Sequence, residues 1–290
     1  MTAKSLKAAK PFLKWAGGKY RIADLILAKL PPGKRFVEPF AGSAAIYLNT
    51  PCKTALVSDS NRDLIALYRC IQTDGLPFID YCRSFFSEEN NRKERFYELR
   101  ERFNSSNESR ERAALLLYLN RYAYNGLVRY NARGEFNVPF GAYKRPYFPF
   151  AELSAFHART RETDTRFIAE DFRKVFSGLT PGDVVYCDPP YVPLSATANF
   201  TAYEGTPFGF EDQKALAALA RVAAGRSIPV LISNHDTAIT RALYSGAEVT
   251  YFDVQRLISC KGGKRALLRN CWLCINSQDF KKAPKARLVA

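Results

Sequence analysis

The order of apolar runs and helical stretches is the feature that most constrains this fold. Residues 36–40 form a short apolar run that predicts a buried strand, and residues 44–49 have helical character. A second apolar run at 54–57 precedes a stretch of helical periodicity that reaches Gln72. Because parallel neighbours in a sheet need a crossover connection, this alternation predicts an α/β fold with a parallel sheet.

The alternation stops after residue 73 and resumes near residue 150. Residues 78–124 are charge-rich with helical periodicity, whereas 125–150 are rich in Tyr, Asn, Gly, Arg and Pro. The pairs Asn125-Gly126 and Arg133-Gly134 are turn signals, so a β-hairpin or an ordered loop is expected there. We therefore expect three parts: a sheet domain of residues 1–73 and 150–280, an inserted and mainly helical domain of residues 74–149, and a basic, disordered tail of residues 281–290.

The remaining elements complete the predicted sheet. Helices are expected at 20–30, 151–161, 211–224 and 237–244, and further strands at 166–169, 184–188, 228–233, 249–254 and 271–275. A turn rich in Gly and Lys, residues 261–264, separates the last two strands. We therefore expect an antiparallel hairpin at the edge of the sheet.

The sequence Asp188-Pro189-Pro190-Tyr191 directly follows the apolar run 183–187. Two prolines prevent the strand from continuing and prevent an immediate helix, so the turn is stiff. It lies at the carboxyl end of a strand, where open α/β sheets bind ligands. The Asp188 carboxylate and a proline carbonyl can each accept one hydrogen of an exocyclic amine, and the Tyr191 ring can stack on a planar molecule. The turn therefore suits a planar ligand with an amino group.

Three loops near other strand ends suit a nucleoside-like ligand. Gly42 follows the first strand and allows close approach of a ligand to the backbone, although a tight turn alone would also explain it. Asp59 ends the second strand and can accept hydrogen bonds from ribose hydroxyls, although it could instead cap the next helix. The segment Lys14 to Lys19, KWAGGK, could cradle the ligand or serve as a loop before a helix.

The chain is strongly basic, which points to a polyanionic partner. It has 43 Lys and Arg against 28 Asp and Glu, a formal net charge of +15. Nucleic acid is the commonest such partner. Tyr and Phe are interleaved with Arg and Lys in residues 120–147, a composition that suits contacts with phosphates and bases. A solvated face packed by tyrosines is the alternative explanation of this segment.

Other features exclude several classes of protein. No apolar run approaches the ~20 residues needed to span a bilayer, so we expect a cytoplasmic protein without membrane contact. The seven cysteines are scattered among apolar residues, as reduced thiols would be. Cys271 and Cys274 lie in a predicted strand without a second ligand pair, so no metal is expected. His157 and His235 are interpreted as structural or surface residues.

Six motifs in their order make the chain resemble the Dam family of DNA adenine-N6 methyltransferases over about residues 11–260. These motifs are KWAGGK, FVEPFAGSAA, SDSNRDLI, LYLNRYAYNGLVRYNARGEFNVPFGAYKRPYFP, VVYCDPPYVPLSATANFTAY and PVLISNHDT. The resemblance implies a Rossmann-like methyltransferase sheet with an inserted DNA-recognition domain. It implies transfer of a methyl group from S-adenosylmethionine to adenine N6 in double-stranded DNA, in the sequence GATC, with base flipping. A monomer associated with the nucleoid is expected.

The resemblance also assigns roles to individual residues. The residues implied in catalysis are Asp188, Pro189 and Tyr191. Those implied in cofactor binding are Trp15, Lys19, Phe40, Gly42, Asp59, Asp171, Phe172 and Asp188. Those implied in DNA binding are Lys14, Arg100, Tyr124, Asn125, Leu127, Arg129, Asn131, Pro139 and Tyr143. Within this last set, Leu127 and Arg129 would read the outer bases, and Tyr124 would wedge where the adenine leaves the stack.

The sequence departs from the family pattern at two places. Two alternatives to the implied function are also open. Ala142 stands where the family usually has a basic residue, and the segment after Gly263 differs from the usual sequence. An adenine-N6 or cytosine-N4 methyltransferase of a restriction system, with another recognition sequence, is the alternative enzyme. An inactive DNA-binding relative is the alternative from another class.

Overall fold

The computed structural model describes residues 8–191, 208–255 and 267–275. The described strands form one seven-stranded sheet in the order β3-β2-β1-β4-β5-β7-β6. Their bounds are β1 (Arg35–Glu38), β2 (Thr54–Ser58), β3 (Asp164–Ile168), β4 (Asp183–Cys187), β5 (Val230–His235), β6 (Glu248–Gln255) and β7 (Leu267–Ile275). The predicted α/β class and its terminal antiparallel hairpin are confirmed.

The chain divides into two compact units. The first unit contains residues 1–28 and 41–169, and the second contains residues 29–40 and 170–290. This division follows compactness alone, so the functional domain boundaries expected at residues 74 and 149 stay a prediction.

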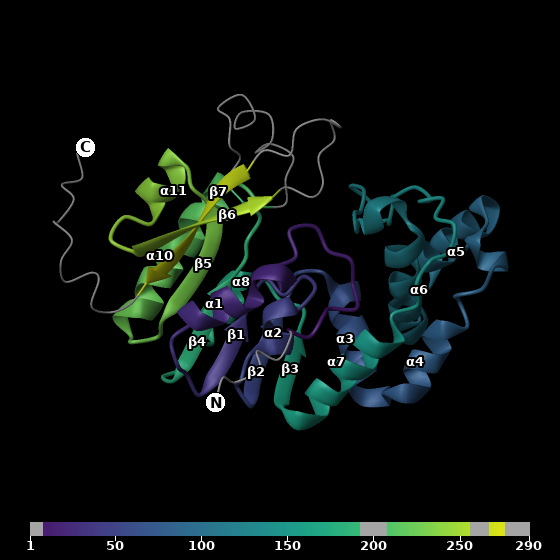
Figure 1. Ribbon diagram of the computed structural model, residues 1–290, viewed down its shortest axis with the longest axis horizontal. Helices are drawn as coiled ribbons and strands as arrows, with labels where there is room; N and C mark the ends of the chain where they lie inside the picture. The colour runs from purple at the N-terminus through teal and green to yellow at the C-terminus, as the bar shows by residue number, and fades with distance from the viewer. Residues whose placement is uncertain (1–7, 192–207, 256–266, 276–290) are drawn as a thin grey trace, which may run out of the picture. The chain divides into compact units, whose positions relative to one another are not determined.

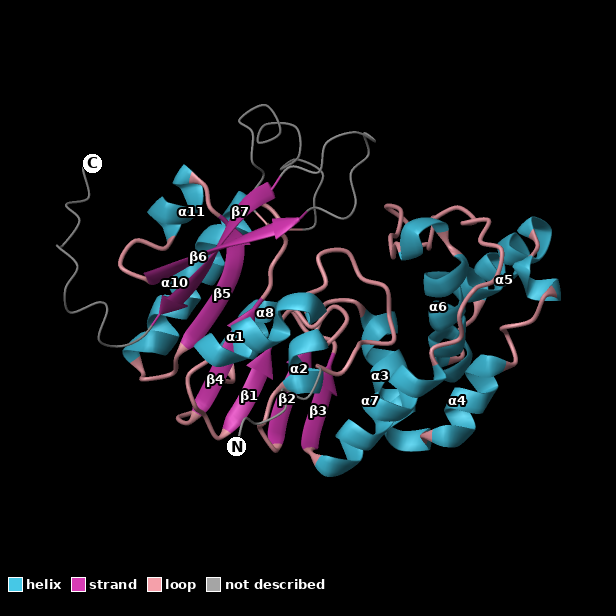
Figure 2. Cartoon of the chain, viewed as in Figure 1, coloured by secondary structure: helices cyan, strands magenta, loops and turns pink. Residues whose placement is uncertain are grey.

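In the second unit, strand β4 lies between two parallel neighbours, β1 and β5. All five residues of β4 are buried. Asp183 at its start accepts two hydrogen bonds of 2.7 Å from the Arg35 guanidinium at the start of β1. Strand β7 then pairs antiparallel with both β5 and β6, as the magenta arrows of Figure 2 show. The ion pair holds the first residue of β4 in place. The buried residues that follow continue the strand up to Cys187, directly before the Asp188 turn.

Among the described residues of the same unit, the helices are α8 (Phe172–Ser177), α10 (Phe210–Gly225) and α11 (Ala238–Leu243). Helix α10 contacts α8 and also packs on β5 and β7 (Figure 1). Its buried residues include Leu216, Ala217 and Ala220, which recur at helical spacing. This packing brings the amino end of α10 to the loop that follows β4.

In the first unit, β2 and β3 pair in parallel from Thr54↔Asp164 to Ser58↔Ile168. The described part of this unit also contains η1 (Tyr20–Ile22), all but the last residue of α1 (Ala23–Lys29), α2 (Ala45–Asn49), α3 (Arg62–Asp74) and α7 (Phe150–Glu162), of which α3 and α7 contact β3. The ring of Phe156 stacks on Tyr68 at 5.0 Å and on Phe167 at 5.8 Å between centroids, which ties α7 to α3 and β3.

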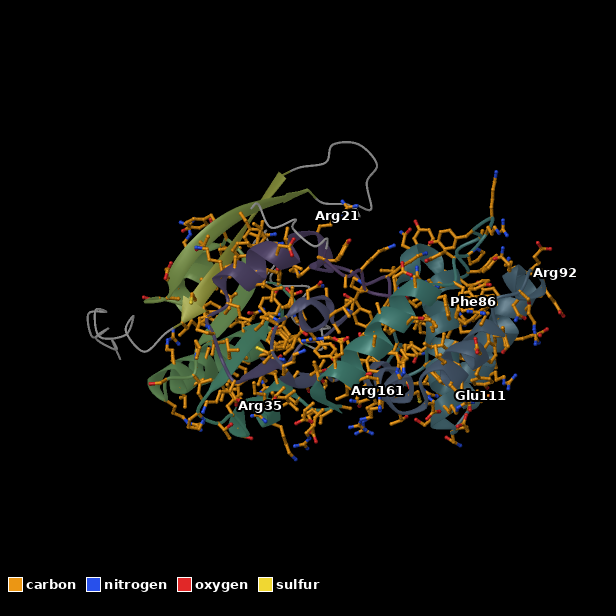
Figure 3. All side chains as sticks on the ribbon, turned by 60° about the horizontal axis from the view of Figure 1, so that its bottom comes forward. Arg21, Arg35, Phe86, Arg92, Glu111 and Arg161 are labelled. Atoms are coloured by element: carbon orange, nitrogen blue, oxygen red, sulfur yellow. The ribbon has the colours of Figure 1, made fainter. Side chains whose placement is uncertain are left out.

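The segment between α3 and α7 is mainly helical, as predicted. It contains α4 (Leu76–Arg83), η2 (Glu89–Asn91), α5 (Lys93–Ser105), α6 (Ser109–Tyr122) and η3 (Tyr124–Gly126). Helix α6 is buried on every side from residue 113 to residue 122 and packs against α3, α4 and α5 (Figure 1). Phe86, labelled in Figure 3, contacts the rings of Tyr118, Tyr122 and Phe148. Helix α6 is therefore the central element of this segment.

Residues 123–149 form an ordered loop with two isolated antiparallel bridges, Ala123↔Phe140 and Tyr130↔Phe136. Of the two structures expected from the turn signals, the ordered loop is the one observed among the described residues. The predicted turn at 261–264 and the predicted tail at 281–290 lie outside the described residues.

Several exclusions can be checked against the described part of the chain. None of its helices combines the length and apolarity needed to cross a bilayer. It contains no group of His, Cys, Asp and Glu that could hold a metal ion. Cys271 and Cys274 are free thiols. The Nδ1 atom of His157 lies 2.9 Å from the Ile71 carbonyl oxygen, which agrees with a structural histidine.

Candidate functional site

A buried glutamine holds the turn that follows β4. Gln213, in the first turn of α10, is 1% exposed. Its Nε2 donates a hydrogen bond of 2.6 Å to the Pro190 carbonyl, and its Oε1 accepts one of 3.3 Å from Asn234 Nδ2. Because two prolines already restrict the backbone, this bond fixes the direction in which the Asp188-Pro189-Pro190-Tyr191 sequence leaves the sheet.

Tyr191 is packed into the same corner of the second unit. Its ring meets that of His235 edge-on, with 4.8 Å between centroids, and its hydroxyl lies beside the Ser233 hydroxyl and the Asp188 carboxylate. Burial, and then the negative charge of Asp188, raise the pKa of Tyr191 well above its usual value. The phenol is therefore neutral at physiological pH. Stacking of Tyr191 on a base stays a prediction.

Two of the predicted cofactor residues in this unit meet in an aromatic cluster. The ring centroids of Phe40 and Phe172 are 5.4 Å apart, and Phe208 lies 5.6 Å from each. Asp171 caps α8 by accepting a hydrogen bond of 2.8 Å from the Arg173 amide, and it also pairs with the Arg173 guanidinium. The structure thus gives Asp171 a capping role, and its contact with a cofactor stays a prediction.

In the first unit, Asp59 organises the two loops that follow β1 and β2. Its Oδ2 accepts a hydrogen bond of 3.0 Å from the Gly42 amide, and its Oδ1 accepts one of 2.9 Å from the Asn61 amide. Burial raises the pKa of Asp59, and these two backbone bonds oppose that rise. The cap of α3 is Asn61, whose side chain accepts from the Leu64 amide, so the helix-cap explanation of Asp59 is wrong.

Trp15 lies against Gly42, which must be glycine. Gly42 has a φ of +47°, and a Cβ built on it would lie 2.6 Å from Trp15 Nε1. The buried Lys19 donates a hydrogen bond of 2.6 Å from Nζ to the Gly17 carbonyl, and the Gly18 amide donates one of 3.1 Å to the Trp15 carbonyl. Residues 15–19 therefore form a tight turn beside Gly42, as expected for a loop that cradles a ligand.

The loop after α6 carries most of the predicted DNA-binding residues. We call residues 124–131 the reading loop. Tyr124 is 54% exposed, Asn125 and Arg129 are also exposed, and Leu127 is half-buried. The Tyr124 amide donates a hydrogen bond of 2.9 Å to the carbonyl of the exposed Pro139. An exposed aromatic ring between polar side chains suits contact with bases.

Three of the predicted DNA-binding residues already form side-chain hydrogen bonds within the protein. Arg129 donates to Asn137 Oδ1 at 2.8 Å, and Arg100 donates to the Val138 carbonyl at 3.3 Å. Asn131 is used locally, because its side chain bonds the 133 and 135 amides and the Glu135 carboxylate. Its contact with DNA is therefore not supported by the geometry and stays a prediction.

Lys14 and Tyr143 lie together beside the reading loop. The Lys14 Nζ is 4.3 Å from the centroid of the Tyr143 ring, in cation–π geometry. Burial, and then the charge of Arg121, lower the pKa of Lys14. Ala142 is exposed and has a φ of +50°.

Three polar residues that hold these loops were not singled out from the sequence: Gln213 and Asn120, which are buried, and Tyr130, which is half-buried. Asn120 is 0% exposed in an otherwise apolar stretch of α6, and that burial cannot be read from a single sequence. The only signal was a polar residue inside an apolar run, which also occurs on the exposed face of ordinary helices.

Comparison with known proteins identifies the family. Residues 15–258 match the family described as D12 class N6 adenine-specific DNA methyltransferase. The chain belongs to this family. The DNA adenine methylase of Escherichia coli strain K12 is 48% identical over 260 residues, which cover 90% of this chain and 93% of the relative. The DNA adenine methylase of Serratia marcescens is 49% identical over 255 residues, covering 88% and 94%. The one from Vibrio cholerae serotype O1 strain N16961 is 45% identical over 261 residues, covering 90% and 94%.

Membership in the D12 class makes this chain an adenine-specific DNA methyltransferase. The predicted family, the predicted enzyme class and DNA as the partner are thereby confirmed. The family also implies a methyl donor. The individual cofactor and DNA contacts stay predictions, because no comparison assigns them.

Proposed function

We propose that this D12-class enzyme transfers a methyl group from S-adenosylmethionine to the N6 amine of adenine in GATC sequences of double-stranded DNA. The observation that carries the proposal is the structure of the sequence Asp188-Pro189-Pro190-Tyr191, which we call the acceptor turn. It directly follows a fully buried strand, and the Gln213 side chain holds it through a hydrogen bond to the Pro190 carbonyl. The sequence GATC is proposed from the likeness to the DNA adenine methylases of enterobacteria.

The residues of the first unit fit the nucleoside part of the donor. Gly42 allows the Trp15 indole to lie directly against the backbone of the loop after β1, which places an aromatic ring beside the Asp59 carboxylate's partner. The Asp59 carboxylate accepts two backbone hydrogen bonds. A carboxylate has about four acceptor sites, so about two remain for ribose hydroxyls. In the second unit, the Phe40 and Phe172 rings, tilted by 31° to each other, supply apolar surroundings suited to an adenine.

Asp188 and Pro189 would act on the target amine. When bound, S-adenosylmethionine supplies an electrophilic methyl group. The Asp188 carboxylate and the Pro189 carbonyl would each accept one N6 hydrogen, which directs the nitrogen lone pair out of the ring plane. Positive charge develops on N6 during transfer, and the carboxylate and the carbonyl dipole stabilise it. Because the turn is fixed before substrate binds, correct orientation lowers the barrier without further ordering.

The reading loop would deliver the adenine to this turn. An adenine must leave the duplex before its amine can be reached, which costs a few kcal/mol. The exposed Tyr124 ring would fill the vacated space. Leu127 and Arg129 would read the outer bases, since an arginine can bond a guanine edge with two N–H groups. Lys14, Arg100, Asn125, Asn131, Pro139 and Tyr143 would complete the DNA contacts.

The chain would work as a monomer in the cytoplasm, and residues 74–149 would form its DNA-recognition domain. The inserted segment supports the last point, because the reading loop and the helices around it all lie within it.

Transfer of a labelled methyl group from S-adenosylmethionine to short duplexes tests the proposed function. Wild type is expected to label a GATC duplex and to leave a duplex with an altered outer base pair, which keeps the target adenines, unlabelled. Asp188→Ala is expected to abolish labelling while binding of the duplex persists, because the reading loop does not depend on that carboxylate. Wild-type rates in the Asp188→Ala variant would remove the proposed mechanism.

A further inference from the structure

Asn120 joins two segments that are distant in the sequence. Its side chain is completely buried near the end of α6. Its Oδ1 accepts a hydrogen bond of 2.9 Å from the Lys14 amide, and its Nδ2 donates to the Lys14 carbonyl at 2.7 Å and to the Gly126 carbonyl at 2.9 Å. The side-chain amide of Asn120 therefore binds both the residue that precedes the 15–19 turn and the reading loop.

The two segments are also in direct contact beside Asn120. Gly126 has a φ of +64°, and a Cβ built on it would lie 2.5 Å from Lys14 Cδ and 2.6 Å from Lys14 Cβ. The absence of a side chain at residue 126 thus allows the reading loop to rest on Lys14. Because Lys14 and Gly126 are closely packed, a shift of residues 14–15 would also move the reading loop.

A second tie lies at the other end of the reading loop. The Tyr130 hydroxyl donates a hydrogen bond of 2.9 Å to Asp63 Oδ2, and the Asn61 side chain also bonds it. Arg112 bonds both oxygens of Asp63, at 3.0 and 3.1 Å, so this carboxylate is fixed. Asn61 in turn bonds Asp59 through its amide. The far end of the reading loop is therefore attached to the Asp59 corner.

We propose that Asn120 and Tyr130 are positioning residues that couple the cofactor-binding segments to the reading loop. Binding of the donor or its product analogue at residues 15–19 and Asp59 would fix both ends of the reading loop before DNA arrives. DNA would then bind more tightly, because part of the ordering has already taken place. This inference rests on the proposed function, since it uses the cofactor and DNA roles assigned there.

The test measures the dissociation constant of a fluorescent GATC duplex with and without saturating S-adenosylhomocysteine. In wild type the duplex is expected to bind at least about fivefold more tightly with the analogue, the lower end of typical coupling between sites. Linkage requires the analogue to bind more tightly by the same factor when the duplex is present. In Asn120→Ala and Tyr130→Phe the factor is expected to fall close to one.

Matched controls separate coupling from general loss of structure. The buried Asn90 donates a hydrogen bond of 3.0 Å from its side chain to the Phe85 carbonyl, and Tyr118 donates a buried hydrogen bond of 2.6 Å to the Asn90 carbonyl. Neither contacts Lys14 or Asp63 in these bonds. Asn90→Ala and Tyr118→Phe are therefore expected to keep the wild-type coupling factor even if they unfold at a lower temperature.

Hydrogen exchange gives a second readout that simple destabilisation does not reproduce. The analogue alone is expected to slow exchange at amides 124–131 in wild type but not in Tyr130→Phe, which removes a single hydroxyl and keeps the ring. That variant decides the question if Asn120→Ala does not fold.

The possible results distinguish failure of the coupling inference from failure of the proposed function. A wild-type factor of one, or an unchanged factor in Tyr130→Phe, overturns the inference and leaves the proposed function intact. A wild type that binds duplex and analogue with coupling but transfers no methyl group overturns the proposed function alone.

Discussion

Replacing Gln213 with methionine tests whether the hydrogen bond under the acceptor turn positions the turn for catalysis. Methionine has a similar length and is apolar, so Gln213→Met removes both hydrogen bonds of the side chain with little change in volume. Two groups then lose their hydrogen bond to residue 213: the Pro190 carbonyl, bonded at 2.6 Å, and Asn234 Nδ2, bonded at 3.3 Å.

The structure allows the size of the effect to be worked out. A hydrogen bond contributes about 0.5–1.5 kcal/mol net to stability. Pro190 is exposed, so water can replace the bond to its carbonyl and the cost there falls at the lower end. Because two hydrogen bonds are removed, we expect a loss of about 1–3 kcal/mol in the free energy of unfolding. A misplacement of the turn by about 1 Å would lower the transfer rate by roughly 100-fold.

Single-turnover transfer of labelled methyl groups measures the rate, and urea unfolding measures the stability. The dissociation constant of the duplex should stay at the wild-type value, because the reading loop belongs to the other unit. Lys214→Ala is the matched control, since Lys214 is the next residue of α10 and its exposed side chain contacts only residues of α10 itself in its ion pair with Glu211 and its cation–π contact with Phe210. A Gln213→Met variant that is destabilised as expected but transfers methyl at the wild-type rate would refute the positioning argument.

Three further predictions concern the cofactor loop, base readout and acid stability. Gly42→Ala should weaken binding of S-adenosylhomocysteine at least tenfold in calorimetry, because its Cβ would strike an indole; Gly134→Ala, with a φ of +77° and no atom within 4 Å of its Cβ, should leave binding unchanged. Arg129→Ala should cost about 1–3 kcal/mol of discrimination against altered sites, and equal losses of rate on cognate and altered duplexes would contradict its reading role. Burial raises the pKa of Asp212, but the hydrogen bonds from Arg173 and from the Gly209 amide, together with the charge of Arg173, outweigh it and leave the pKa below its usual value. The stabilisation is thus present above the unfolded pKa of about 4 and is lost as pH falls through the folded value, so Asp212→Asn should show a flatter loss of stability below about pH 4 in urea unfolding.

Much of the sheet and the position of the Asp188 turn could be predicted because the signals are local. The apolar run 183–187 and the two prolines after it require only the chemistry of adjacent residues. At Gly42 a glycine after a strand predicted close approach of a ligand; the structure shows instead that the Trp15 indole lies against it, and the ligand contact stays a prediction. The order of strands and helices then restricted the fold to a parallel sheet.

The residues that hold the site could not be predicted, because their partners are far away in the sequence. Asn120 bonds Lys14 across 106 positions, and Tyr130 bonds Asp63 across 67 positions. The cap of α3 could be narrowed from the sequence to Asn61 or Ser60, with Asp59 as a further alternative, and the structure confirms Asn61. Several polar residues near the end of a strand compete for the cap, and only the fold decides which one takes it.

The central claim is that the turn carrying Asp188 accepts the amine of an adenine that the reading loop has selected. Base-resolved mapping of modified bases in plasmid DNA, after incubation with the enzyme and S-adenosylmethionine, tests it most directly. The account predicts N6-methyladenine in GATC sequences with wild type and none with Asp188→Ala. Methylation of cytosine N4, or of adenines without a common flanking sequence, would contradict it.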